Sequence, residues 1–312
     1  MPGVQLLLRA ATLIFFLLLL LPSTQAQSTR CQWATLRSAT DAVLDSVRTG
    51  TLSTFPRSAN FTYTQNLHPT NLAAPESILS APISAAHVHS IIDQDACATF
   101  IKLLLSPSDA PGNGNEPILV GMHLHYTRAT STGGSTLTAL HLVSAGPQDW
   151  QMGVAPSTPT PDITPTLLSY LEKEDWTAIS RARQDSREVL LSVAGSYLDF
   201  LAGNSTPPSN STSNSTVVVP VPWGRPCSRL DGAVYVAIGE EERCDKGIVT
   251  FQEGPGHGVG VTERSSLVVD ESVGAVSVLA RDGRLHDAAS SFEMRVVAGR
   301  LRYVHQFASL MG

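Results

Sequence analysis

An internal repeat constrains the fold of this chain more than any other feature of its sequence. Three segments of the first half align with three of the second in the same order: residues 36–47 with 190–201, 91–96 with 268–273, and 137–142 with 301–306. Self-similarity of this kind indicates a repeated structural unit. Each match is short, but three matches in one order predict a duplication.

Both repeats begin with a helical pattern and continue with strands. In the first pair of matching segments, apolar side chains recur at helical spacing. The second pair reads as a strand that ends in an acidic turn, and β-rich sequence follows in both halves. The sequence therefore predicts an α+β fold, in which one face of a curved, mostly antiparallel sheet wraps a helix and can leave a pocket. A packed core without a cavity is the alternative.

The N-terminal segment has the order of a cleavable signal peptide. It has a positive charge at Arg9, an apolar run from Leu13 to Leu21, and a small residue at Ala26. An uncleaved anchor is the alternative, but the run is shorter than the roughly 20 residues that span a bilayer. We expect a secreted or lumenal protein with no integral membrane segment after cleavage. The expected organisation is signal peptide 1–26, first domain 27–155, Pro-rich linker 156–166 and second domain 167–312.

Charge and motifs exclude several classes of function. The net charge is −6 at pH 7 and no basic stripe occurs, which argues against nucleic acid as a partner. The Gly-rich stretch 254–258 lacks the Lys-Ser/Thr of a phosphate loop, and neither a Gly-x-Ser-x-Gly elbow nor a His-Glu-x-x-His motif is present. We expect no cofactor, and the sequence leaves the oligomeric state open.

The cysteines favour disulfides over free thiols. An even number behind a signal peptide is typical of oxidised proteins. Four cysteines permit three connectivities, and their distribution suggests one bridge in each half, Cys31 to Cys97 and Cys227 to Cys244. A zinc site is the competing interpretation, but no pair has the C-x2-C spacing.

Four sequons predict N-glycosylation, at Asn60, Asn204, Asn210 and Asn214. Three of them lie in residues 204–216, a Ser/Thr/Asn/Pro-rich stretch that is too polar to pack. We expect this stretch to be a glycosylated surface loop.

Several motifs resemble those of a family of secreted fungal proteins of poorly defined function. They lie at residues 221–232, 268–271 and 299–305 of the second half, and at residues 93–100 and 148–150 of the first. The resemblance implies two tandem cone-shaped ketosteroid isomerase-like (nuclear transport factor 2-like) domains. It also implies a link to fungal secondary-metabolite genes, where such proteins assist the cyclisation or dimerisation of polyketide-derived anhydrides.

The chain departs from this family pattern in two places. Asp231 stands where a glutamate is expected, and residues 289–293 lack the histidine and one acid of the family's stretch. The second departure puts any shared catalytic role of that stretch in doubt.

Two histidines are candidate catalytic residues. Regular strand alternation groups His305 with Leu301 and Tyr303, and His141 with Leu137, which predicts that both histidines face the concave side of their sheets. A histidine there could act as a general base on a carbon acid or donate a hydrogen bond to an enolate. The structural alternative is a buried core histidine whose two ring nitrogens both have hydrogen-bond partners within the protein. Tyr303, from the same face, is a candidate for substrate binding.

Acidic and basic residues supply further candidates. Asp93 and Asp270 end equivalent strands and are candidate bases, although aspartate at a hairpin end commonly caps the turn. Arg229, beside Asp231, is a candidate for binding an anionic substrate, and a buried ion pair between the two is the structural alternative. The spacing of His123 and His125 suits a metal, but we expect this pair to point outward and expect no metal site.

These patterns lead to two hypotheses. The first is a cofactor-free cyclase or isomerase-like enzyme of fungal secondary metabolism, which removes a proton next to a carbonyl of a small apolar substrate. The second is a secreted ligand-binding protein or host-directed effector without catalysis. In either case one half can be purely structural, and we expect that half to be the first, because the second carries more of the family motifs.

Overall fold

The structure is a computed structural model that describes residues 30–105, 117–128, 135–152, 164–202, 220–239, 244 and 260–310. The signal segment 1–26, the sequons at Asn204, Asn210 and Asn214, and residues 153–163 of the linker region lie outside the described residues. Asn60 is described, and it is exposed on a strand.

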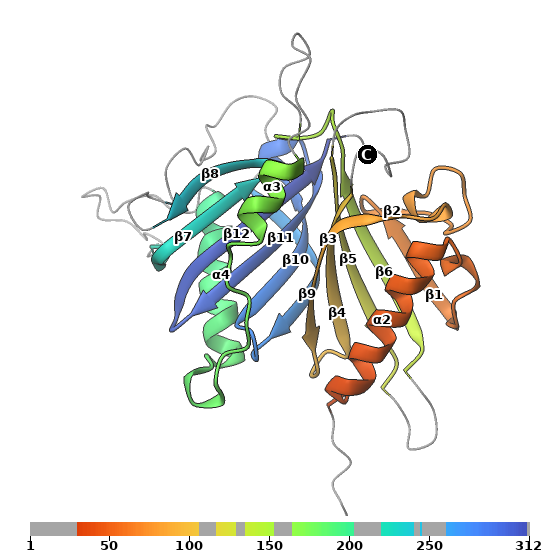
Figure 1. Cartoon of the computed structure of the whole chain (residues 1–312), viewed down its shortest axis with the longest axis horizontal. Coiled ribbons are helices and arrows are strands. Elements are labelled where there is room, and N and C mark those ends of the chain that lie inside the picture. The colour runs from red at the N-terminus through yellow and green to blue at the C-terminus, as the bar shows by residue number, and fades with distance from the viewer. Residues whose placement is uncertain are drawn as a thin grey trace, which may run out of the picture.

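The described part of the first half contains one α-helix and one six-stranded sheet (Figure 1). Helix α2 spans Trp33–Thr49. The strands are β1 (Arg57–Gln65), β2 (His68–Pro69), β3 (Ala85–Asp93), β4 (Ala98–Leu105), β5 (Ile118–Tyr126) and β6 (Leu137–Ala145). Their order in the sheet is β2-β1-β6-β5-β4-β3, and only the β1–β6 pair is parallel.

The second half repeats this arrangement. Helix α3 (Thr164–Leu171) leads into it and helix α4 spans Arg187–Leu201. The strands are β7 (Trp223–Asp231), β8 (Val234–Gly239), β9 (Val261–Asp270), β10 (Ala275–Asp282), β11 (Ala288–Val297) and β12 (Arg300–Ser309). Their order, β8-β7-β12-β11-β10-β9, matches the first sheet strand for strand, again with one parallel pair, β7–β12. The α+β prediction is confirmed, although α3 begins inside the segment expected to be linker.

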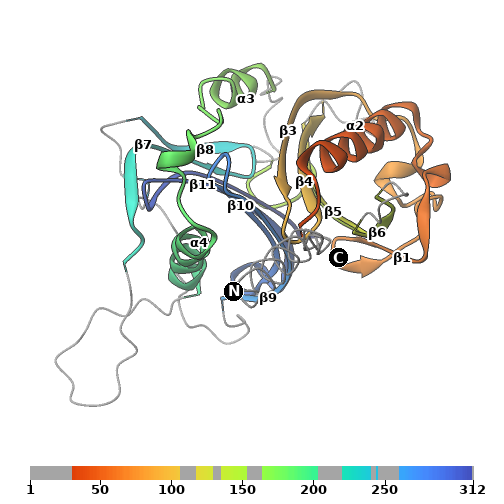
Figure 2. The same ribbon diagram turned by 90° about the horizontal axis from the view of Figure 1, so that it is seen from below.

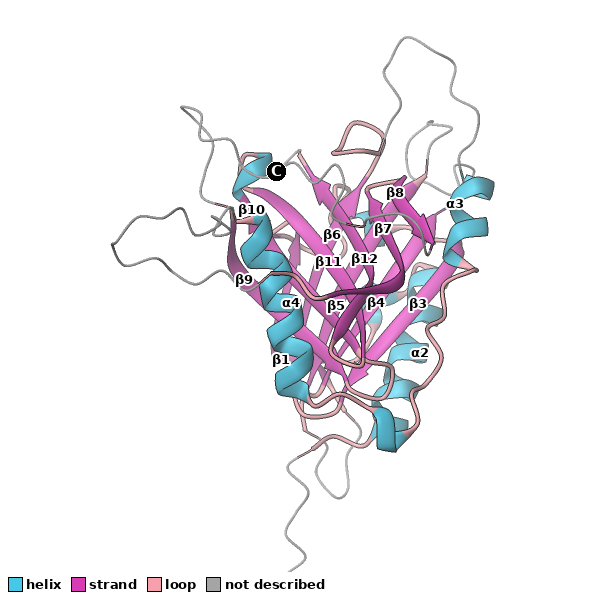
Figure 3. Cartoon of the chain, turned by 90° about the vertical axis from the view of Figure 1, so that its left-hand side faces the viewer, coloured by secondary structure: helices cyan, strands magenta, loops and turns pink. Residues whose placement is uncertain are grey.

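Helices α2 and α4 each cover one face of their own sheet. The apolar positions of α2, among them Leu36, Val43 and Val47, pack on Ile101 and Met122 of the sheet. Helix α2 ends at Gly50, whose φ of 70° is the left-handed conformation that glycine adopts without strain. Ser186 caps the start of α4 by accepting a hydrogen bond from the Val189 N–H. Figure 3 shows α4 lying across the second sheet.

The two sheets also share an irregularity. Thr138 is an extra residue of β6, because Ala139 pairs with His125 while Leu137 pairs with Tyr126. Arg302 is the corresponding extra residue of β12, where Arg295 pairs with Tyr303 and Val296 with Leu301. Such β-bulges shift the alternation of the side chains that follow them. Bulges at matching positions are what a duplicated unit would carry.

The sheet faces that turn away from the helices pack against each other, and α2 and α4 lie on opposite outer sides (Figure 2). Strands β3 and β9 are neighbours across this interface. Apolar side chains from both sheets meet there, including Phe100 with Val268 at one place, and Leu104 with Leu279 and Phe307 at another. The described residues therefore form one core under α2, one under α4 and a further core between the sheets, to which α3 contributes Leu167 and Leu171.

A reciprocal pair of aspartates joins the halves. The Asp93 carboxylate accepts a hydrogen bond from the Val269 N–H at 2.9 Å, and the Asp270 carboxylate accepts one from the Ile92 N–H at 2.8 Å. Asp93 also receives two hydrogen bonds from the Arg187 guanidinium, at 2.9 and 2.8 Å. The halves are thus related by an approximate two-fold relationship within one chain.

Both predicted disulfides are present, Cys31–Cys97 and Cys227–Cys244. The first fastens the start of α2 to the β3–β4 turn, and the second fastens β7 to residue 244. No described helix is long and apolar enough to cross a membrane.

Candidate functional site

The structure corrects the predicted orientation of both candidate histidines. Because of the bulges at Thr138 and Arg302, the side chains that share the helix-covered face with Leu137 and Leu301 are Leu140 and Val304. His141 and His305 follow those residues, so each lies on the face that meets the other sheet. Regular alternation had predicted the opposite side.

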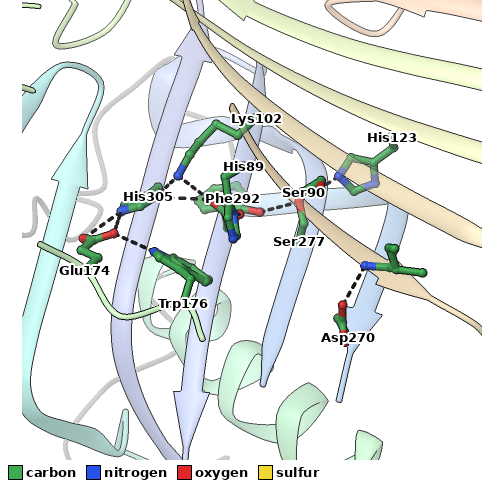
Figure 4. A network of polar contacts seen from close by, with 12 residues as sticks. His89, Ser90, Lys102, His123, Glu174, Trp176, Asp270, Ser277, Phe292 and His305 are labelled. Carbon is green, nitrogen blue, oxygen red and sulfur yellow. Dashed lines mark hydrogen bonds and ion pairs between the residues drawn. The ribbon is translucent and has the colours of Figure 1, made fainter. Parts of the chain in front are cut away.

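His305 is the centre of a buried polar network between the sheets, drawn in Figure 4. Its Nε2 lies 2.8 Å from a carboxylate oxygen of Glu174, and its Nδ1 lies 3.2 Å from Oε2 of Glu293. Lys102 of β4 reaches across from the first sheet, and its ammonium donates to the same Glu293 oxygen at 2.5 Å while also contacting His305. His89 of β3 binds the other Glu293 oxygen at 2.6 Å.

Trp176 closes this network on the side of the segment that precedes α4. Its indole N–H donates to Glu174 at 3.0 Å, and its ring lies 4.5 Å from the His89 ring and 5.7 Å from the Lys102 ammonium. Ser228 of β7 donates to the second Glu174 oxygen. The segment 174–176 therefore ties the sheets together through one carboxylate and one aromatic ring.

The contacts of the network shift the pKa values of its histidine and its two glutamates. Burial lowers the pKa of His305, but Glu174 raises it, and the net shift is upward, which favours the protonated ring. Burial raises the pKa of Glu174, but His305 and the hydrogen bonds outweigh it and bring the pKa to about 2. In the same way Lys102 and His89 keep the pKa of Glu293 well below its usual range despite burial. Lys102 and His305 thus face the carboxylates of Glu174 and Glu293.

This network has the properties of a structural element. The Lys102 side chain is 1% exposed and those of Glu293 and His305 are fully buried, and both nitrogens of His305 have partners. A catalytic base has to reach its substrate. The arrangement matches the structural alternative for His305, a buried core histidine whose two ring nitrogens both have hydrogen-bond partners.

The other predicted residues on this side are also engaged by the fold. His141 contacts Thr64 at 2.9 Å, and burial lowers its pKa. Besides their bonds across the interface, Asp93 accepts from the Ala96 N–H and Asp270 from the Ser272 N–H, so both cap the turns that follow their strands. We assign both aspartates a structural role.

The pair His123 and His125 points toward the second sheet. His123 is fully buried and contacts Ser266 and Ser277 at 2.9 Å each, and His125 contacts Ser266 at 2.8 Å. The prediction that the pair points outward is therefore wrong, because this face of the first sheet packs against the second sheet. No group of metal-ligating side chains occurs within the described part of the chain.

A second polar cluster lies on the other face of the second sheet, under α4. Arg229 and Asp231 of β7 form a buried ion pair, with 3.1 Å between Nη2 and Oδ2. A further Arg229 nitrogen donates to the Cys244 carbonyl at 2.7 Å, so the Cys227–Cys244 disulfide holds the group that orients this guanidinium. The structural alternative for Arg229, a buried ion pair with Asp231, is confirmed.

Asp282 and Arg284 form a second ion pair in this cluster. The Arg284 Nε donates to Asp282 at 2.9 Å, and the Gln306 side-chain amide donates to the other Asp282 oxygen at 3.0 Å. The buried phenol of Tyr197 on α4 is close enough that burial first, and then the charge of Asp231, raise its pKa.

Asp231 is the acid of this cluster best suited to exchange a proton. Arg229 is its hydrogen-bond partner, whereas Asp282 is bound by both Arg284 and Gln306. The Asp231 side chain is 13% exposed, compared with 0% for the Asp282 side chain. Burial raises the pKa of Asp231 and outweighs the opposing effect of Arg229, so its carboxylate is more basic than an ordinary one.

The first half has no such cluster at the equivalent positions. The registers β1–β6 and β7–β12 place Tyr63 where the second half has Arg229, and Gln65 where it has Asp231. Leu105 and Leu142 replace Asp282 and Gln306, and Val43 replaces Tyr197. The core under α2 is accordingly apolar, and the one under α4 is charged at one end.

Sequence reasoning missed Lys102, Glu174 and Glu293 as a group. One signal was present, because Lys102 interrupts an otherwise apolar strand, and a lysine in such a strand needs a buried partner. The identity of that partner, 191 residues further along the chain, depends on how the sheets pack and has no sequence signature.

The fold and the cluster under α4 define an α+β protein of two repeated halves. At the equivalent positions compared above, only the second half carries buried ion pairs under its helix. In agreement with this division, residues 183–308 match the model of a domain of unknown function (DUF8021), a range that includes α4 and all of the second sheet except the last residue of β12. A search of curated proteins found no match.

Proposed function

We propose that the protein is a cofactor-free enzyme that transfers a proton next to a carbonyl, and that the cluster under α4 is its site. The observation that carries this proposal is the contrast between the halves. Equivalent positions hold Tyr63 and Gln65 in one core but the Arg229–Asp231 pair in the other. Burying charges is costly, and perturbed titratable groups concentrate at functional sites.

The proposed roles follow from the contacts. Asp231 removes a proton from the carbon next to the substrate carbonyl, and an enolate forms. Arg229 is a positioning residue, because it is fully buried and holds the Asp231 carboxylate. Arg284, whose side chain is 10% exposed, supplies positive charge near the developing oxyanion. If a double bond is conjugated with the enolate, the protonated Asp231 returns the proton to the far carbon and the double bond shifts, which is isomerisation. Otherwise the enolate carbon adds to a second carbonyl and the alkoxide so formed takes the proton from Asp231, which is cyclisation.

The wider setting belongs to the same proposal. The helix-covered sheets are consistent with two tandem ketosteroid isomerase-like cones, the first of them structural. The signal-like N-terminus and two disulfides support a secreted or lumenal protein. With the resemblance to secreted fungal proteins, this points to natural-product biosynthesis and a small apolar carbonyl-bearing substrate.

The test replaces Asp231 with asparagine, which keeps the shape and removes the base. Purified protein is incubated with metabolite extracts of a strain that lacks its gene, and the consumed and formed compounds are followed by mass spectrometry. We expect Asp231→Asn to lower turnover by about 10²- to 10⁴-fold. The control is Asp199→Asn, the same change at a 58% exposed position of α4. Equal turnover by wild type and Asp231→Asn would overturn the proposal.

A further inference from the structure

A cavity of about 310 Å³ lies on the opposite face of the second sheet from the Asp231 cluster. Its walls are strands β11 and β12 and the segment before α4, with Tyr303 and Ile179 among the lining residues. Three arginines line it, Arg183, Arg295 and Arg302, against one acid, Asp175. The cavity is therefore positively charged although the whole chain is acidic.

Arg295 is the central feature of this cavity. It is 4% exposed, and one of its terminal nitrogens donates to the Thr177 carbonyl at 3.0 Å. Its other terminal nitrogen, Nη1, is buried and has no hydrogen-bond partner among the described residues, and the same holds for Nε of Arg302. Burial lowers the pKa of Arg295, and Asp175 opposes this shift only in part.

The acid that lines the cavity is already engaged. The Asp175 carboxylate accepts hydrogen bonds from the Thr177 N–H at 2.9 Å and from the Thr177 hydroxyl at 2.6 Å. A buried guanidinium without a paired carboxylate is costly, and a planar carboxylate is the group that its two-pronged geometry binds best.

The remaining lining limits what the rest of the ligand can be. Ile179, Val297 and Ala298 contribute apolar surface beside the arginines, and the Tyr303 ring forms another wall. The volume lies at the lower end of the range for small-molecule sites. Apolar side chains can pack against the carbon skeleton of an organic ligand, but they offer no polar contact to an inorganic anion.

We propose that this cavity binds a small organic carboxylate, with Arg295 and Arg302 on the carboxylate and the apolar wall on its carbon skeleton. The site is separate from the Asp231 cluster, because Met294 and Val296, which flank Arg295 on β11, belong to the core under α4 and Arg295 points away from it. Such a site would equally serve the second hypothesis, a secreted ligand-binding protein.

The experiment uses the full mature chain and isothermal titration calorimetry. The probes are hexanoate, adipate and benzoate, compared with hexanamide, adipamide and benzamide, and with inorganic phosphate. We expect at least one carboxylate to bind about tenfold or more tightly than its amide and than phosphate, since charged hydrogen bonds contribute that much. Trp176 lies 5.7 Å from the Arg295 guanidinium, so its fluorescence should change on binding.

Two variants locate the binding. Arg295→Met keeps most of the buried volume and removes the charge, and we expect it to weaken carboxylate binding by about tenfold or more. The control Arg300→Met removes the same charge from an exposed position of the neighbouring strand β12 and should bind as wild type does. If Arg295→Met does not fold, Arg302→Gln gives the same comparison.

Three results would overturn the proposal. They are the absence of binding by every carboxylate, equal binding of a carboxylate and its amide, and equal binding by the wild type and the folded Arg295 or Arg302 variant. Tighter binding of phosphate than of any carboxylate would contradict the assignment of the apolar wall.

Discussion

The Lys102–Glu293 pair allows a quantitative test of how the two sheets are held together. At 2.5 Å and an effective dielectric constant of about 20, two unit charges attract by about 7 kcal/mol. Removing each ion from water costs several kcal/mol, so the net contribution of the intact pair is small. The two side chains are 1% and 0% exposed, so a partner left alone has no access to water.

The structure therefore predicts an asymmetric result. Lys102→Met leaves the Glu293 carboxylate with only His89 and His305, and we expect the free energy of unfolding to fall by about 3–5 kcal/mol. The double variant Lys102→Met/Glu293→Gln removes both charges, and it should lose less than the sum of the two single changes.

Urea unfolding at pH 7, followed by circular dichroism under oxidising conditions, measures these differences. Lys173→Met is the matched control, because Lys173 is exposed, and its loss should fall within about 0.5 kcal/mol. A cost below about 1 kcal/mol for Lys102→Met, or strict additivity in the double variant, would refute the interpretation of the pair as a buried, mutually dependent unit.

Two further predictions concern pH and oxidation. The pKa of Glu174 in the folded protein is lowered from 4.5 to about 2, so its contribution to stability is present above pH 4.5 and disappears as the pH falls toward 2. At 1.36 kcal/mol per pKa unit this contribution amounts to about 3 kcal/mol. Glu174→Gln should therefore flatten this part of the curve of stability against pH. An unchanged slope in the variant would contradict this assignment. The Cys31–Cys97 bridge closes a loop of 66 residues, so Cys31→Ser/Cys97→Ser should lower the free energy of unfolding by about 4 kcal/mol, against about 3 for the 17-residue Cys227–Cys244 loop. Thermal unfolding of both double variants gives the comparison, and the reverse order would count against a chain-entropy origin.

The sequence was sufficient for features that depend on local pattern. Helical periodicity predicted α2 and α4, and the distribution of cysteines between the halves predicted both bridges. The alignment of Asp93 with Asp270 placed two residues that the structure shows in equivalent roles.

The sheet face to which the His141 and His305 side chains point could not be derived from the sequence pattern. A single extra residue, Thr138 or Arg302, moves every later side chain of the strand to the other face, and neither residue carries a sequence signal for a bulge. Arg229 and Asp231 were noticed together, but only the register with Gln306 and the contact with Cys244 show that they belong to a charged core.

The reciprocal bonds of Asp93 and Asp270 join two halves that one chain keeps together at any dilution. Two identical subunits in this arrangement would bring every contact residue twice, so a lysine at position 102 would recur opposite a second glutamate. Within a single polypeptide the copies are free to differ: Leu279 stands at the position equivalent to Lys102, and His123 at the position equivalent to Glu293. Fusion thereby allows an asymmetric interface between the halves, with one Lys–Glu ion pair where a homodimer would need two. It also allows one of the two helix-covered cores to have a purely structural role.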